Sequence, residues 1–137
     1  MTTTTSIIDG FRAAAQAFSG APAIVLADGS DMSFSAVDAE SDRIAAGLAA
    51  LGLRPGDRVG LYCINSPEFA CCYLGILKAG GVVLPVNLLY SPPEVSFVLE
   101  DAAVRFLIFH PAMAEKVGQV RAGESRVERY IGTADTE

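Results

Sequence analysis

The sequence predicts an α/β fold in which short parallel strands alternate with helices. The run from Val59 to Ile64 is apolar and uncharged, which is typical of a strand buried on both faces of a parallel sheet. A helix start at Ser66 and Pro67 and a second apolar run, Val82 to Pro85, complete one βαβ unit with a right-handed crossover. Valines that open candidate strands recur at positions 59, 82, 104 and 127, at intervals of 22 or 23 residues.

The N-terminal part is predicted to hold a helix, a β-hairpin and a second helix. Ser6 and Asp9 form a capping signature, and the apolar stripe behind it is Ile7, Phe11, Ala14 or Ala15, and Phe18. The runs 23–27 and 32–34 flank the turn-rich Asp28 to Asp31, which favours a hairpin. Ser35 and Asp38 repeat the capping signature, and Gly52 ends this second helix, whose apolar face is Val37, Ser41, Ile44, Leu48 and Leu51.

The remaining elements follow the βα order. Pro55 and Gly56 predict a tight turn before the first strand, and Gly80 is the expected left-handed residue after a helix over 67–79. Ser91 with Glu94 forms a capping box for a helix over 92–101. We then expect a strand over 104–109, a weaker helix over 111–120, a last strand over 127–131, and an unstructured tail over 133–137.

Composition limits the function classes. At 137 residues one domain is expected, and a hydrophobic share of 51% with a mean hydropathy of +0.38 is high for a free-standing domain. Either the sheet is unusually well covered, or part of the apolar surface packs against something outside this sequence. The net charge of −6 and a pI near 4.7 argue against binding to nucleic acid or anionic membranes.

The cysteines and the apolar run around them predict a reduced, cytoplasmic protein without a membrane span. Cys63, Cys71 and Cys72 lack metal-ligand spacing and are best explained as small buried residues, with a reactive thiol as the alternative. Residues 1–6 lack the features of a secretory signal. The run from Phe69 to Leu89 is interrupted by Lys78, two glycines and Pro85, so a buried helix and strand explain it.

Three polar residues follow the predicted strands, namely Asn65, Asn87 and His110. Because ligands bind at the carboxyl ends of parallel strands, these residues could line one ligand rim. Local capping explains the same residue types. There is no nucleophile motif beside His110, no glycine-rich phosphate loop, no metal-ligand set and no marked pair of acids. No catalytic, cofactor-binding or metal-binding residue is therefore assigned.

Several motifs recur in a fixed order between about Ser33 and Phe109. They are Leu51-Gly52 before Pro55-Gly56-Asp57-Arg58-Val59, Asn65-Ser66-Pro67-Glu68, Lys78-Ala79-Gly80 before Pro85-Val86-Asn87, and Glu94 followed by Leu99-Glu100-Asp101. Together they resemble the N-terminal part of AMP-forming acyl-CoA synthetases, in the adenylate-forming, AMP-binding superfamily. The run Asn87 to Ser91 is more similar to the acyl-CoA ligase branch than to amino-acid adenylation domains.

The resemblance implies an incomplete piece of the large N-terminal domain of such enzymes, spanning residues 1–137. A complete member would use ATP and Mg²⁺ to convert a carboxylate to an acyl-adenylate, and CoA to form the thioester. The family's phosphate loop, ribose-binding aspartate and catalytic lysine have no counterpart in this sequence, so an isolated chain is expected to be inactive and to need the remainder of its domain. The alternatives are a self-standing small-ligand binding module and a protein that self-associates through exposed apolar surface.

Overall fold

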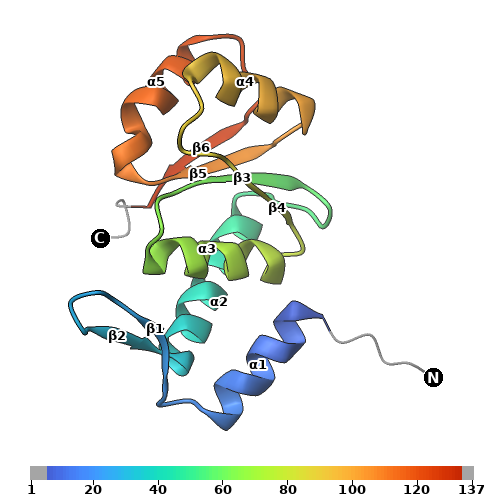
Figure 1. Cartoon of the computed structure of the whole chain (residues 1–137). Helices are drawn as coiled ribbons and strands as arrows, with labels where there is room; N and C mark the ends of the chain where they lie inside the picture. The colour runs from blue at the N-terminus through green and yellow to red at the C-terminus, as the bar shows by residue number, and fades with distance from the viewer. Residues whose placement is uncertain (1–5, 134–137) are drawn as a thin grey trace.

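The computed structural model describes residues 6–133, and it contains a four-stranded parallel sheet covered by helices on both faces (Figure 1). The strands are β3 (Arg58–Tyr62), β4 (Val82–Pro85), β5 (Phe106–Phe109) and β6 (Arg129–Gly132), in the order β4-β3-β5-β6. Arg58 pairs with Val82, Val59 with Phe106, and Phe106 with Arg129, all in parallel register. The predicted α/β fold class is confirmed.

The direction of strand addition reverses between β3 and β5. Helix α3 (Pro67–Lys78) connects β3 to β4 on one face of the sheet. Helix α4 (Pro92–Asp101) leads back past β3 to β5, and η1 (Pro111–Met113) with α5 (Ala114–Ala122) leads on to β6. Because right-handed crossovers that run in opposite directions lie on opposite faces, α4 and α5 cover the other face (Figure 1).

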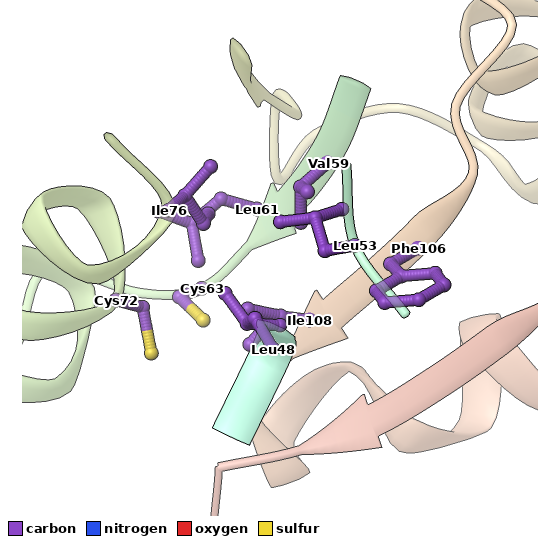
Figure 2. Close-up of a cluster of buried hydrophobic side chains, with 9 residues drawn as sticks. All are labelled: Leu48, Leu53, Val59, Leu61, Cys63, Cys72, Ile76, Phe106 and Ile108. Atoms are coloured by element: carbon purple, nitrogen blue, oxygen red, sulfur yellow. The ribbon is translucent and has the colours of Figure 1, made fainter. Parts of the chain in front are cut away.

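Two clusters of buried apolar side chains correspond to the two faces. The cluster shared with α2 (Phe34–Ala50) and α3 is drawn in Figure 2 and contains Leu48, Leu53, Val59, Leu61, Cys63, Cys72, Ile76, Phe106 and Ile108. The cluster under α4 and α5 contains Tyr62, Val86, Val95, Leu99, Val104, Leu107, Val117 and Val120. Alternate residues of β3 and β5 therefore serve opposite cores, as the pleat of a strand requires.

Helices α2 and α3 approach each other closely because of a glycine. A Cβ atom added at Gly75 would lie 2.6 Å from Cγ2 of Ile44 and 3.2 Å from the carbonyl oxygen of Ser41. Ser41 is fully buried, and its hydroxyl donates a hydrogen bond to the carbonyl of Val37 at 2.7 Å. A polar residue in the predicted apolar stripe is thus satisfied within its own helix.

Lys78 fastens α3 to α2 from the last turn of α3. Its side chain is only 1% exposed, and its Nζ donates to Oδ1 of Asp38 at 2.6 Å and to Oδ1 of Asp42 at 2.8 Å. It also donates to the carbonyl of Asp38 and lies 5.9 Å from the ring centre of Phe11 in α1 (Ile7–Ala17). One buried ammonium group therefore connects three helices.

The N-terminal helix and hairpin lie outside the main sheet (Figure 1). Strands β1 (Pro22–Val25) and β2 (Asp31–Ser33) form a separate antiparallel pair, as predicted, although β2 ends before Phe34. The capping box of Ser6 and Asp9 is confirmed. The predicted stripe of α1 is right at its centre and wrong at its ends. Ala15 is buried and Phe11 is partly buried against Phe34, whereas Ile7 is 69% and Phe18 61% exposed.

The predicted cap of the second helix is wrong by two residues. Ser33, not Ser35, holds the N-cap position, and its Oγ accepts a hydrogen bond from the N–H of Ala36 at 3.1 Å. Ser33 is also the last residue of β2 and has extended backbone angles, so the strand runs directly into the helix. The helix therefore begins at Phe34, whose N–H donates to the carbonyl of Ala21.

The last two strands begin two residues later than their valines suggest. Val104 donates its N–H to the carbonyl of Leu99 and so still belongs to the end of α4, and Val127 bonds to the hydroxyl of Ser125. The single helix predicted over 111–120 is a 3₁₀ turn followed by α5, which ends at Ala122. The strand predicted over 59–64 and the helix predicted over 67–79 end at Tyr62 and Lys78.

At the C-terminal end of the described residues, the chain continues its pairing with β5. The N–H of Thr133 donates to the carbonyl of Phe109 and extends the β5–β6 pairing by one step. Residues 1–5 and 134–137 lie outside the described residues, so the predictions of no secretory signal and of a tail stay predictions. Between residues 6 and 133, no helix combines the length and apolar character that crossing a membrane requires.

Candidate functional site

The three predicted rim residues follow adjacent strands at the carboxyl edge of the sheet. Asn65 follows β3, Asn87 follows β4 and His110 follows β5, and the order β4-β3-β5 makes these strands neighbours. The edge between β3 and β5 is also where strand addition reverses, the place where open α/β sheets usually bind ligands. Asn65 and Asn87 are exposed, and His110 is half-buried.

Two of the three side chains already have local partners. Oδ1 of Asn87 accepts a hydrogen bond from the N–H of Leu89 at 2.9 Å, and Nδ1 of His110 accepts one from the N–H of Ala112 at 3.0 Å. These are capping contacts within two residues of the sequence, as the alternative interpretation expected. The lone pair of His110 Nδ1 is occupied by the hydrogen bond from Ala112, so this nitrogen cannot accept a proton from a ligand while the bond is present.

The residues at this edge do not fit a bound nucleotide or its magnesium ion. The link from β3 to α3 is Cys63-Ile64-Asn65-Ser66, without a glycine, and Ser66 accepts a hydrogen bond from the N–H of Phe69 at 3.3 Å. Glu68 adds a carboxylate in the first turn of α3 and would repel a phosphate there. In the part of the chain that the structure describes, no group of three or more His, Cys, Asp or Glu could hold a metal ion.

The cysteines are buried and free, as the first interpretation predicted. Burial raises the pKa of Cys63 and of Cys71 to about 11 and that of Cys72 to about 12. Such thiols are almost entirely protonated at neutral pH, and the thiolate is the nucleophilic form. The chemistry of these side chains in the folded chain is therefore that of small apolar residues.

Tyr62 places a polar atom inside the core beneath α4 and α5. The residue is fully buried, and its hydroxyl is the one buried side-chain polar atom between residues 6 and 133 that has no hydrogen-bond partner. Burial raises the pKa of this phenol, so the hydroxyl stays neutral. A lone neutral hydroxyl in an apolar cluster offers no catalytic partner.

Arg105 organises the opposite, amino edge of the sheet, and the sequence patterns did not mark it. Its Nη1 donates to Oδ2 of Asp57 and to the carbonyl of Gly52, and its Nε donates to Oε2 of Glu128 at 3.0 Å. The guanidinium group thereby joins the turn before β3 to the start of β6. The hydrogen bond from the Arg54 N–H and the bond from Arg105 lower the pKa of Asp57.

An apolar hollow lies on the α2/α3 face, and we call it the α2–β6 groove. It has a volume of about 460 Å³. Its lining residues are Glu40, Arg43, Ile44, Gly47, Leu48, Ala50, Leu51, Glu68, Cys72, Ile108, Ile131, Gly132 and Thr133. Sequence reasoning did not locate this groove, although the high apolar share of the composition was its signal.

The groove lies where the cover of the sheet stops. Helices α2 and α3 supply Leu48 and Cys72 to the core above β3 and β5, whereas Ile131 of β6 is only partly buried there. At the rim, Arg43 pairs with Glu40 at 3.0 Å, and Leu51 remains 40% exposed. An apolar floor with a polar rim is the usual composition of a surface that is covered in a complete protein.

Comparisons with known proteins agree with this fold and with an incomplete domain. The family described as "AMP-binding enzyme" matches residues 11–135. Long-chain-fatty-acid–CoA ligase FadD13 of Mycobacterium tuberculosis is 38% identical over 91 residues, which are 66% of this chain and 18% of that protein. Crotonobetaine/carnitine–CoA ligase of Salmonella paratyphi A is 31% identical over 99 residues, covering 72% of this chain and 19% of that protein.

Solved structures give the same result. The N-terminal domain of FACL13 from Mycobacterium tuberculosis superposes with a TM-score of 0.88 at 31% identity, covering 96% of this chain and 34% of that domain. The chain thus spans about a fifth of the length of the curated relatives that it matches, and about a third of a solved N-terminal domain. Its fold is the N-terminal piece of a larger α/β domain.

Proposed function

Because the chain belongs to the AMP-binding enzyme family, we propose that it is the N-terminal segment of an ATP-dependent acyl-CoA ligase and is inactive by itself. The complete protein would convert a carboxylate and ATP to an acyl-adenylate and pyrophosphate, and would then form the thioester with CoA. The observation that carries the proposal is the match over residues 11–135 to a family whose similar members include acyl-CoA ligases.

The cofactors of that reaction would be ATP, CoA and Mg²⁺, held by the remainder of the protein. The carboxyl edge of this sheet has no phosphate loop, and among the described residues there is no metal-ligand group. We therefore assign the chain a structural part: it supplies a four-stranded parallel sheet of the large domain and helices on both faces of that sheet. Its small-molecule carboxylate would be bound with those other parts, and the cytoplasm is the expected compartment.

A self-standing ligand-binding module has less support. Asn87 and His110 would have to bind the ligand at the rim, yet one side-chain acceptor of each is engaged with the adjacent backbone. Self-association through apolar surface is supported by the open groove and by exposed side chains such as Leu89, which is 89% exposed. Self-association would explain the exposed apolar surface of an isolated chain, but it would not explain why residues 11–135 match the AMP-binding enzyme family.

The test is carboxylate-dependent pyrophosphate release. The polypeptide read from the gene past the codon for Glu137 is incubated with ATP, Mg²⁺ and a panel of fatty, aromatic and dicarboxylic acids, and acyl-CoA is measured after CoA is added. We expect release with the longer protein and none with the 137-residue chain. Activity of the short chain alone, or a longer protein inactive toward every acid, would refute the proposal.

A further inference from the structure

The α2–β6 groove is an apolar hollow of about 460 Å³ that lies open among the described residues, 6–133. Its floor joins Leu48 of α2, Cys72 of α3, Ile108 of β5 and Ile131 of β6. The opposite face of the same strands is closed by α4 and α5, so the opening is specific to one face and one end of the sheet.

The last described residues run along the groove. Gly132 and Thr133 both line it, and Thr133 continues the pairing with β5. Relatives that match this chain are nearly four times as long, since 91 residues make up 18% of one and 99 residues make up 19% of the other, so in the proposed ligase a long polypeptide follows from this point. The groove therefore lies beside the place where the rest of the protein would begin.

Handedness restricts which part of that polypeptide can fill the groove. The steps from β4 to β5 and from β5 to β6 carry their helices on the α4/α5 face. A further parallel strand added beside β6 would place its connecting helix on that same face, because the crossover is right-handed. The helix of the next βα unit consequently cannot cover the α2–β6 groove.

We infer that the α2–β6 groove docks a later, apolar segment of the full-length protein, one that crosses to the α2/α3 face rather than following β6 as the next crossover helix. This inference rests on the proposed function in one respect, namely that the polypeptide continues beyond this chain. The occupant presents an apolar face to Leu48, Ile108 and Ile131, and its flanks meet the polar rim of Glu40, Arg43 and Glu68.

Two matched leucines test the inference. Leu51 lines the groove and is 40% exposed, and Leu26, in the hairpin turn, is 39% exposed and lies outside it. Leu51→Arg and Leu26→Arg are made in the 137-residue chain and in the full-length protein, and melting temperatures are compared. In the short chain both variants should melt within a few degrees of the unchanged sequence, because about two fifths of each residue is already exposed and an arginine there can extend its charge into water.

In the full-length protein only Leu51→Arg should lower the melting temperature, by about 5 °C or more, because the new charge would be buried under the docked segment. Equal shifts for the two full-length variants would overturn the inference. So would a dimer of the short chain that Leu51→Arg abolishes while the full-length protein is unaffected, because the occupant would then be a second copy.

The outcome is separable from that of the proposed function. A full-length protein that shows the selective shift but releases no pyrophosphate with any acid would refute the ligase and keep the docking site. An active full-length protein in which Leu51→Arg and Leu26→Arg melt alike would refute the docking site alone.

Discussion

On the face of the sheet covered by α4 and α5, side chains of β3 and β5 meet a continuous layer of helices. On the face covered by α2 and α3, that layer ends above β5 and leaves the α2–β6 groove. The first face is closed by α4 and α5, two crossover helices that follow each other in the sequence, whereas the second is covered by α2 and by the crossover helix α3. A piece of a doubly wound sheet can therefore be complete on one face and unfinished on the other.

The two faces also differ in the contacts of one lysine each, the buried side chain of Lys78 and the partly buried Lys116, and the largest expected effect comes from this difference. Lys78, on the α2/α3 face, contacts two carboxylates, whereas Lys116 of α5 donates to the carbonyls of Leu88 and Tyr90 at 3.1 and 3.0 Å. Lys78→Ala should lower the unfolding free energy by about 2–4 kcal/mol. This loss is smaller than that expected for breaking a fully buried ion pair, because more than half of the Asp42 side chain is exposed.

Lys116→Ala is the matched change on the other face and should cost less, about 1–2 kcal/mol, because both hydrogen bonds of this partly buried ammonium run to neutral carbonyls. Urea unfolding followed by circular dichroism measures both values. Lys78→Met keeps the aliphatic stem and separates lost packing from lost charge. Similar losses for Lys78→Ala and Lys116→Ala would contradict the view that the ammonium of Lys78 joins three helices.

The next effect compares a glycine on each face. Gly75→Ala should destabilise the chain by about 1–3 kcal/mol, because the new Cβ would lie only 2.6 and 2.8 Å from Cγ2 and Cβ of Ile44. To relieve this overlap, α2 and α3 would have to move apart. At Gly60 of β3 the nearest atoms, at 2.8 and 3.2 Å, are the flexible ends of Leu107 and Leu99.

Gly60→Ala should therefore cost less than Gly75→Ala, by about 1 kcal/mol, in the same denaturation measurement. The double variant Gly75→Ala with Ile44→Ala is the control, since shortening Ile44 should recover part of the loss at Gly75. Absence of that recovery would show that close approach of α2 and α3 is not the reason for the glycine.

A smaller, stabilising effect is expected at the end of α4. Ala103 has a φ of 51°, and it is the one residue other than glycine among the described residues with a positive φ. Ala103→Gly should raise the unfolding free energy by about 1 kcal/mol, because the left-handed conformation carries a steric cost for a residue with a Cβ. The opposite change, Gly80→Ala, should lower the unfolding free energy, since Gly80 already has a φ of 82° and an alanine there would carry the same steric cost. A loss of stability in Ala103→Gly would contradict this account.

The smallest effect concerns pH at the amino edge. In the folded chain the pKa of Asp57 lies below its ordinary value of 3.8, through hydrogen bonds from the Arg54 N–H and from Arg105. Its stabilisation is thus present above pH 3.8 and is lost as the pH falls through the lowered pKa of the folded state. Unfolding of Asp57→Asn should be less sensitive to pH in this acidic range than that of the unchanged chain. Parallel pH profiles for the two would count against the assigned partners.

Local signals in the sequence were sufficient for most elements. The capping residues Ser6 and Ser66, the proline at position 67 and the glycine at position 80 satisfy or end helices through contacts with their immediate neighbours, so they act wherever the segment lies. Ser35 failed as a cap because Ser33, two residues earlier, was already fixed at the end of a strand by pairing with β1. The pairing partner, not the serine spacing, decided between them.

The fold class and the order of helices and strands could be predicted from the sequence, because these depend on periodicity, caps and residue types. The strand order, the burial of Lys78 between α2 and α3, and the position of the open groove became known only from the folded chain. Each of these depends on contacts between residues far apart in the chain, such as Lys78 with Asp38 or Leu48 with Ile108, which no local pattern encodes.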